Sequence, residues 1–155
     1  MGLMERLAKA SDKFYDRMRS ADATNVAHAE PTGRMADLTG HKYCVLVSYR
    51  RNGQPVPSPL WFGVAGDKLY FQTSPDGYKV KRIANNPQVR VAPCTNRGKP
   101  LGPPFTGTAR ILPDGEAPTA ERALRSNYGV GRRIYTAFSD KVPSVYVEVT
   151  PIAAG

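Results

Sequence analysis

The sequence predicts a small, mostly β protein in which meandering strands, interrupted by short helices, form one barrel. Its 155 residues suffice for a single domain, and its 41% hydrophobic residues suffice for a core. Short segments rich in β-branched and aromatic residues follow one another, with turn signals between them. Because the helical segments among them are short, this order favours a small barrel over a doubly wound sheet.

Six segments have the composition of strands, and the second of them is unusual. The six are residues 43–49, 55–64, 68–73, 88–94, 105–112 and 145–150. Residues 51–54, Arg-Asn-Gly-Gln, supply a hairpin turn between the first two. Three prolines alternate in the first half of the second segment, and proline has no N–H to donate to a ladder. We therefore expect that half at a sheet edge, or facing something other than a strand.

The chain begins with a predicted amphipathic helix. Residues 3–19 place apolar side chains on one face and charged ones toward the other. Such a helix is expected to pack on its own protein or a partner subunit, with peripheral membrane contact as the alternative. A linker follows, so the expected organisation is an N-terminal helical arm and linker at 1–37 and a compact domain at 38–155. Further helices are expected at 34–38, 78–86, 119–128 and 132–138.

Composition limits the classes of function. The net charge of +9 attracts polyanions, which include nucleic acid, acidic lipid and small ligands with several phosphates or carboxylates. No apolar run reaches the roughly 20 residues of a membrane-spanning helix, and the charged first ten residues are unlike a signal peptide, so we expect a cytoplasmic protein. Cys44 and Cys94 are expected as buried thiols, and the two separated histidines belong to no metal-ligand motif.

The segment from Thr73 to Arg82 combines groups that suit an anion. It is predicted as a loop that starts a helix, where unpaired backbone N–H groups carry a partial positive charge. Thr73 and Ser74 add hydroxyl donors, while Lys79 and Arg82 are three residues apart and share a helical face. The segment is therefore a candidate phosphate site. A solvated basic helix face is the alternative interpretation.

Several short motifs carry a resemblance. Three of them follow in order: Val-Pro-Ser-Pro-Leu-Trp-Phe at 56–62, Leu-Tyr-Phe-Gln-Thr-Ser at 69–74 and Lys-Val-Lys-Arg-Ile-Ala-Asn-Asn-Pro-Gln-Val at 79–89. Together they resemble the FMN-binding split-barrel superfamily, which includes pyridoxamine-phosphate oxidases and flavin/deazaflavin oxidoreductases. Pro-Leu-Trp-Phe at 59–62, Val-Ala-Pro-Cys at 91–94, Gly-Lys-Pro-Leu-Gly-Pro at 98–103, Gly-Thr-Ala-Arg at 107–110 and Asn-Tyr-Gly at 127–129 are similar to its F420-dependent branch. The resemblance covers about residues 38–150 and implies a split β-barrel.

The resemblance also implies a cofactor site. The residues that would line a tricyclic ring are Val56, Pro57, Ser58, Pro59, Leu60 and Trp61. The residues that would hold the cofactor's phosphate are Thr73, Ser74, Lys79 and Arg82. The barrels of this superfamily pair, so a homodimer with the cofactor in the interface groove is implied, and the loop with Arg97 and Lys99 would help to bind it. No side chain is assigned as catalytic and no metal is implied, while Trp61 has an ordinary core position as its alternative.

Charge favours one cofactor over another. FMN has one phosphate, whereas coenzyme F420 has a phosphodiester, a lactyl carboxylate and a glutamate tail, so the basic excess suits F420. The expected function is an F420-dependent reductase that transfers hydride from reduced F420 to an organic substrate. The alternatives are an FMN-binding oxidase or reductase and a non-catalytic F420-binding protein. Pyridoxal chemistry is disfavoured because no basic segment follows Thr150, and nucleic acid because no nucleic-acid motif is present.

Overall fold

The computed structural model describes residues 21–129, 132 and 143–152 of the chain. The strands are β1 (Tyr43–Tyr49), β2 (Pro55–Leu60), β3 (Gly63–Ala65), β4 (Lys68–Thr73), β5 (Gln88–Cys94), β6 (Phe105–Ile111) and β7 (Val145–Pro151). The α-helices are α2 (Tyr78–Asn85) and α3 (Ala117–Tyr128), and the 3-10 helices are η1 (Ala21–Ala27), η2 (Met35–Leu38) and η3 (Asp114–Glu116). The expected helix at 132–138 lies, apart from Arg132, outside the described residues.

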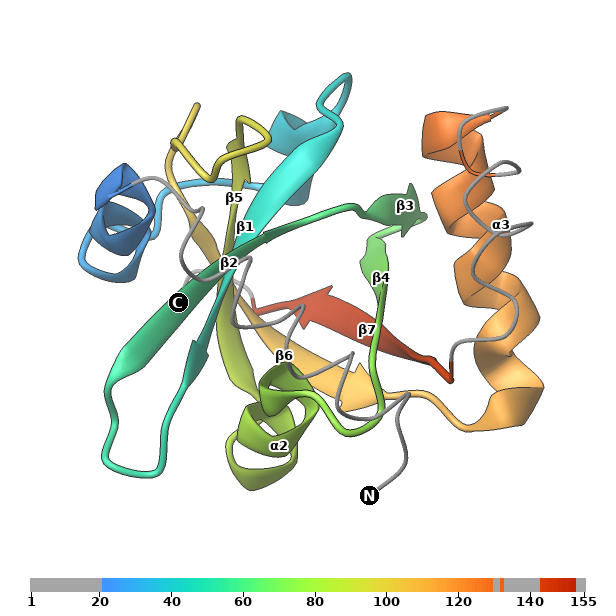
Figure 1. The fold of residues 1–155 in the computed structure, drawn as a ribbon. Coiled ribbons are helices and arrows are strands. Elements are labelled where there is room, and N and C mark those ends of the chain that lie inside the picture. Colours follow the sequence, from blue (N-terminus) through green and yellow to red (C-terminus); the bar gives the residue numbers. More distant parts are fainter. Residues whose placement is uncertain (1–20, 130–131, 133–142, 153–155) are drawn as a thin grey trace.

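The strands form one antiparallel sheet in the order β2-β1-β5-β6-β7-β4-β3. β2 and β3 lie at opposite ends of this order, yet Trp61 and Phe62 alone separate them in the chain. The chain therefore connects the two edges of the sheet, which curls into a split barrel (Figure 1). This confirms the mostly β split-barrel fold, and it divides the expected strand at 55–64 into two.

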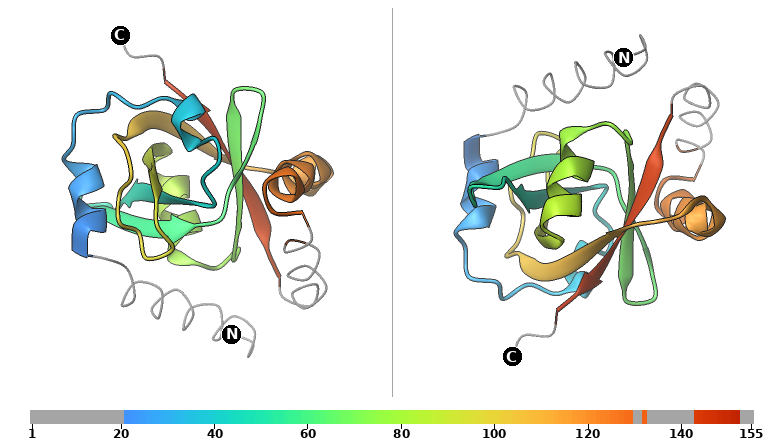
Figure 2. Two further views of the ribbon diagram at one scale, coloured as in Figure 1. Left: turned by 90° about the horizontal axis from the view of Figure 1, so that it is seen from above. Right: turned by 90° about the horizontal axis from the view of Figure 1, so that it is seen from below.

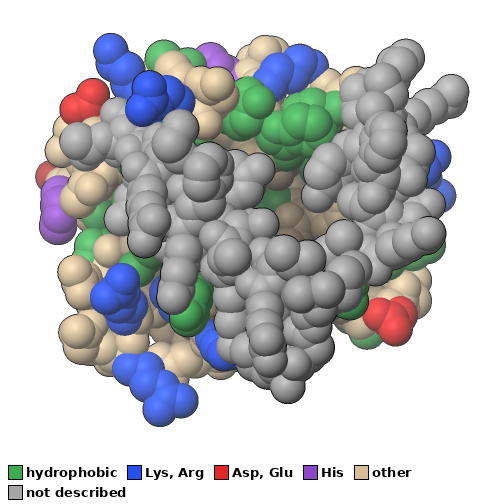
Figure 3. Space-filling model, in the orientation of Figure 1, with side chains coloured by type: hydrophobic (Ala, Val, Ile, Leu, Met, Phe, Trp, Pro, Cys, Tyr) green, Lys and Arg blue, Asp and Glu red, His purple; other side chains and the backbone are tan. Residues whose placement is uncertain are grey.

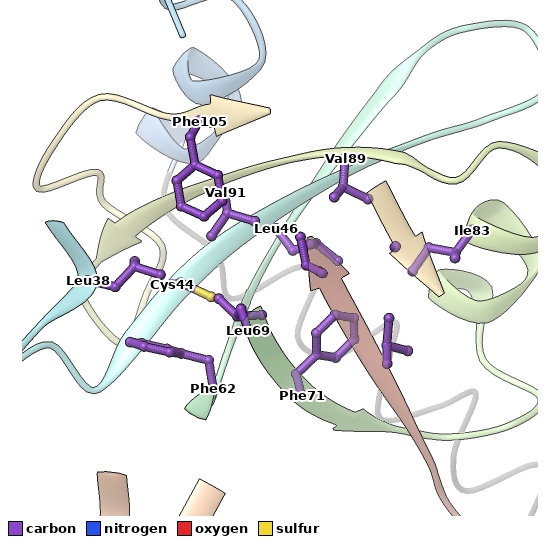
Figure 4. Packing of buried hydrophobic residues seen from close by; sticks show 13 residues of the cluster. Leu38, Cys44, Leu46, Phe62, Leu69, Phe71, Ile83, Val89, Val91 and Phe105 are labelled. Atoms are coloured by element: carbon purple, nitrogen blue, oxygen red, sulfur yellow. The ribbon is translucent and has the colours of Figure 1, made fainter. Parts of the chain in front are cut away.

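The interior of the barrel is apolar. Leu46, Leu69 and Phe71 are fully buried and point into the same interior from β1 and β4 (Figure 4). α2 covers one end of the barrel and adds Ile83 to this cluster (Figure 2). Burial of this kind contributes roughly 1.5–3 kcal/mol for each large apolar side chain. The cluster therefore fixes the positions of β1 and α2, from which several candidate site residues project.

The prediction for the prolines of the second strand is confirmed, because β2 is an edge strand. Pro55, Pro57 and Pro59 lie opposite Tyr49, Val47 and Val45 of β1. In an antiparallel pair, alternate residues direct their N–H groups to the partner strand, so the positions between the prolines can supply these donors. The prolines, which lack an N–H donor, therefore occupy the positions that face the outward edge of β2. Another strand could not pair regularly with this edge.

The described part of the expected N-terminal arm packs on the barrel. η1 buries Ala23 and Val26 against β1 and β5, and the Arg90 guanidinium donates to the carbonyl of Ala29 at 2.7 Å. The amphipathic helix expected at 3–19 lies outside the described residues. Within the described part, no helix has both the length and the apolar character needed to span a bilayer.

The two cysteines are free, buried thiols, as predicted. Cys44 belongs to the interior cluster and Cys94 to the cluster under η1, so their side chains lie on opposite faces of the sheet. Burial raises the pKa of Cys44, and it raises the pKa of Cys94 to about 12. Both thiols are therefore poor nucleophiles and act as apolar packing groups.

Candidate cofactor site

The predicted phosphate site forms a continuous segment between β4 and α2. Thr73 ends β4, and Ser74 accepts a hydrogen bond through its carbonyl oxygen from the N–H of Gly77 at 3.1 Å. This turn leads into α2, whose first turn contains Lys79. Thr73, Ser74 and Lys79 are half-buried. The structure thus places two hydroxyls and a cation together at the start of a helix, where an anion is favoured.

Arg82 connects this segment to the β1–β2 hairpin. Its Nε donates a hydrogen bond to Oγ of Ser48 in β1 at 2.6 Å. Ser48 lies opposite Val56 of β2, so the guanidinium is held beside the first of the predicted ring-lining residues. Sequence reasoning named Arg82 but not Ser48, because the two are 34 positions apart and nothing in their local pattern relates them.

The six predicted ring-lining residues do not share one face of the chain. Val56 and Ser58 lie opposite Ser48 and Leu46, and Leu46 belongs to the interior cluster. Paired residues direct their side chains to the same face of a sheet, so Val56, Ser58 and Leu60 face inward. Pro57 and Pro59 face the other way. Their partners, Val47 and Val45, belong to the outer cluster with η1, so these prolines present main chain rather than side chains to the inner side.

Trp61 is stacked on a tyrosine. The ring centroids of Trp61 and Tyr128 are 4.6 Å apart with an interplanar angle of 21°. The Tyr128 hydroxyl accepts a hydrogen bond from the N–H of Phe62 at 2.7 Å and donates to the carbonyl of Lys42 at 2.5 Å. The end of α3 is thereby attached to the β2–β3 connection, and it fixes the orientation of the Trp61 indole.

Asn127 strengthens the same attachment. Its side-chain amide donates to the carbonyl of Phe62 at 2.9 Å and to that of His41 at 3.3 Å. Lys42 donates to the carbonyl of Asn127 and lies over the Tyr128 ring, 5.6 Å from its centroid. The sequence singled out Asn127 and Tyr128 through a resemblance alone, since their partners are more than 60 residues away.

One face of the molecule carries both basic and apolar side chains. The basic groups lie at several places around it, and apolar side chains lie above a hollow (Figure 3). Trp61 comes five positions after Val56, which corresponds to roughly 17 Å along an extended strand. The inner side of β2 therefore runs from a cationic end at Arg82 to an aromatic end at Trp61.

The loop with Arg97 and Lys99, which was expected to help bind the cofactor, lies on the outer side of β2. Arg97 and Lys99 are exposed, and both of their backbone N–H groups donate to Oγ of Thr95. Gly98 between them lies close to Ala23 of η1 and to Pro59. Within this chain the loop thus lies beside the outer face of β2, whereas Arg82 binds Ser48 on the inner face.

Neither Tyr128 nor Tyr146 is poised as an acid. Burial raises the pKa of Tyr128, and the Tyr128 hydroxyl already donates to Lys42. Burial and a hydrogen bond to Glu121 raise the pKa of Tyr146 to about 12. Among the described residues no group of three or more metal-ligating side chains occurs. The arrangement can therefore bind and orient an anionic, ring-containing molecule, and its described residues place no nucleophile against it.

The model of the pyridoxamine 5'-phosphate oxidase family matches residues 32–152 of the chain. The chain belongs to this family. Its curled seven-stranded sheet is the FMN-binding split barrel that the resemblance implied. The match covers η2, every strand and both α-helices, so all the candidate residues discussed above lie within it.

Solved structures of several proteins share this fold. HutZ, a heme storage protein from Vibrio cholerae, is 15% identical with a TM-score of 0.60 over 77% of this chain and 87% of that chain. An F420 reductase is 22% identical with a TM-score of 0.54 over 80% and 97%. A FAD-binding protein from Mesorhizobium loti is 22% identical with a TM-score of 0.54 over 75% and 83%. At these identities the likeness establishes the fold alone. No curated protein sequence matches the chain.

Proposed function

We propose that this protein is an F420-dependent reductase that binds its cofactor along the inner side of β2. The observation that carries the proposal is the hydrogen bond from Arg82 to Ser48, which holds the cationic start of α2 beside Val56. A cofactor with its anionic end at α2 and its ring toward Trp61 would meet cations, a hydroxyl and an aromatic pair in that order. Membership of a family with flavin-binding folds and the +9 net charge both support this assignment.

Each candidate residue has a distinct role in this proposal. The groups that would hold the anionic part are Thr73, Ser74, Lys79 and Arg82. Val56, Ser58 and Leu60 would face the cofactor with their side chains, and Trp61 would bound the ring. Pro57 and Pro59 would contact it through their main chain rather than their side chains. Such fixed contacts orient a cofactor and exclude water from it.

When bound and reduced, F420 supplies a hydride to an organic substrate. The protein's own contribution is binding and orientation, because no described side chain of the site is placed as a nucleophile. The hydroxyls of Tyr128 and Tyr146 both donate to protein acceptors, and their pKa values are raised. We therefore expect the balancing proton to come from solvent.

A homodimer with the cofactor in the groove between the subunits is part of the proposal and rests on the family resemblance. A second subunit would bring another copy of the loop with Arg97 and Lys99, whose cations lie away from Arg82 within one chain. Light scattering in solution should give twice the mass of the 155-residue chain. A monomer that binds the cofactor with full affinity would refute this part.

The binding test uses the single tryptophan of the chain, Trp61. Titration with F420 should quench the Trp61 emission and change the fluorescence of F420 itself, with saturation at micromolar concentration. No change in either signal at micromolar F420 would overturn the proposal. Mixing with reduced F420 and electron-poor acceptors such as quinones then tests catalysis. Binding without any oxidation of reduced F420 would favour a non-catalytic F420-binding protein.

The second candidate is an FMN-binding oxidase or reductase. The structural likeness to a FAD-binding protein favours it, because one phosphate would suffice for the hydroxyls and cations at the start of α2. A titration in which FMN quenches Trp61 at lower concentration than F420 would select this candidate. The reverse order of affinities would select F420.

A further inference from the structure

The Ser58 hydroxyl is buried, and the described residues supply it with no hydrogen-bond partner. Ser58 is 5% exposed, and no hydrogen bond involves its side chain in the part of the chain that the structure describes. Ser48, on the same inner face, is 1% exposed but accepts a hydrogen bond from Arg82. Buried hydroxyls are almost always paired with protein, water or a ligand, so the partner of Ser58 calls for an explanation.

The position of Ser58 in β2 shows where this hydroxyl is directed. Ser58 lies opposite Leu46, whose side chain belongs to the barrel interior, so its own side chain lies on the inner face. The residues on either side of it, Pro57 and Pro59, have no N–H groups, so neither can donate a hydrogen bond to the Ser58 hydroxyl. Along the strand Ser58 is roughly 7 Å beyond Val56 and roughly 10 Å before Trp61. The hydroxyl thus lies between the cationic and the aromatic ends of the candidate site.

We propose that the Ser58 hydroxyl donates a hydrogen bond to the polyol chain that joins the ring of a flavin-type cofactor to its phosphate. This inference rests on the proposed function. In flavins and deazaflavins alike, a ribityl chain with three free hydroxyls separates the ring from the anionic group. With the anionic group at Arg82 and the ring at Trp61, that chain passes the level of Ser58. The role of Ser58 is therefore the same whether the cofactor is F420 or FMN.

The test is a series of three ligands with the same ring. FMN has the polyol chain and the phosphate, riboflavin has the polyol chain alone, and lumiflavin has neither. F420, 8-hydroxy-5-deazariboflavin and its 10-methyl analogue form the parallel deazaflavin series. Dissociation constants come from quenching of Trp61 emission. In each series, Ser58→Ala should weaken the binding of the first two ligands by roughly tenfold and leave the binding of the third unchanged.

A second readout separates ligand binding from folding. Because the hydroxyl has no partner in the described chain, Ser58→Ala should leave the melting temperature of the cofactor-free protein unchanged or raise it. The matched control is Ser126→Ala, which removes a hydroxyl that donates to the carbonyl of Ala123 on α3 and should leave all affinities unchanged.

Three outcomes would overturn the inference. Equal weakening of all three ligands would place the hydrogen bond on the ring, and unchanged affinities would mean that water satisfies Ser58. A fall in the melting temperature of the cofactor-free variant would indicate a structural hydrogen bond. If the wild type binds no member of either series, the proposed function fails together with the inference. Normal wild-type binding with an unchanged variant refutes the inference alone.

Discussion

Beneath α3 the buried polar side chains are paired with one another, whereas on the inner face of β2 the Ser58 hydroxyl has no partner among the described residues. Arg132 is 2% exposed, and its guanidinium donates to both carboxylate oxygens of Glu121, at 2.7 and 2.8 Å. It also donates to Gln72 of β4, while Tyr146 of β7 donates to Glu121. α3, β4 and β7 are thereby held together by a network in which each charge has an opposite partner.

The polar side chains of a second network along the sheet are also paired with one another. Tyr70 donates to Glu148 at 3.0 Å, and Arg110 binds Glu148 and both carboxylate oxygens of Glu116. Paired groups of this kind stabilise the fold when all members are present. The difference between the two regions suggests a rule for this protein. Removal of a buried paired group should cost stability, whereas removal of a group on the inner side of β2 should cost cofactor binding.

The largest expected effect is on stability. Glu121→Gln keeps the shape of the side chain but leaves the buried Arg132 guanidinium without its countercharge. We expect the free energy of unfolding to fall by about 3 kcal/mol, as when one member of a buried ion pair is removed. Urea denaturation followed by Trp61 emission measures it. The matched control is Glu116→Gln at an exposed pair with Arg110, which should change stability little. Equal losses in the two variants would contradict the rule.

The pH dependence of stability should have the same origin. Burial opposes ionisation of Glu121, but hydrogen bonds from Arg132 and Tyr146 outweigh it and lower its pKa below 4.5. A carboxyl with a lowered folded-state pKa stabilises the fold above its unfolded pKa, and this contribution is lost as the pH falls through the folded value. The melting temperature should thus decline below about pH 4.5, and less steeply in Glu121→Gln than in wild type. Parallel curves for the two proteins would show that other carboxyls dominate.

Two lysines on α2 test the part of the comparison that concerns cofactor binding. Lys79 is half-buried in the first turn, whereas Lys81 is exposed and lies over the Tyr78 ring, 5.9 Å from its centroid. Lys79→Ala should weaken F420 binding by roughly tenfold and make it less dependent on salt. Lys81→Ala removes the same charge from the same helix and should bind nearly normally. Equal weakening by both substitutions would mean that the net charge, rather than the site, attracts the cofactor.

Local patterns in the sequence predicted the strands, the edge position of β2 and the helix that begins after Ser74. They did so because alternation, proline chemistry and helix starts depend on near neighbours. They did not predict that Trp61 and Phe62 divide one expected strand into β2 and β3, since this division follows from closure of the barrel. The inward and outward faces of residues 56–60 required the pairing with β1. The Tyr128 attachment and the missing partner of Ser58 likewise depend on contacts between distant segments.

The smallest expected effect is at the junction of the two regions, where Tyr128 of α3 stacks on Trp61. Tyr128→Phe keeps the stack but removes the acceptor for the Phe62 N–H and the donor to the Lys42 carbonyl. We expect a loss of about 1 kcal/mol in the free energy of unfolding, with cofactor affinity lowered less than in Lys79→Ala. Tyr128→Leu also removes the stack, so it should shift the Trp61 emission, which Tyr128→Phe should leave in place. If Tyr128→Phe weakens cofactor binding as strongly as Lys79→Ala while its stability is unchanged, Tyr128 belongs to the cofactor site rather than to the structural attachment of α3 to the β2–β3 connection.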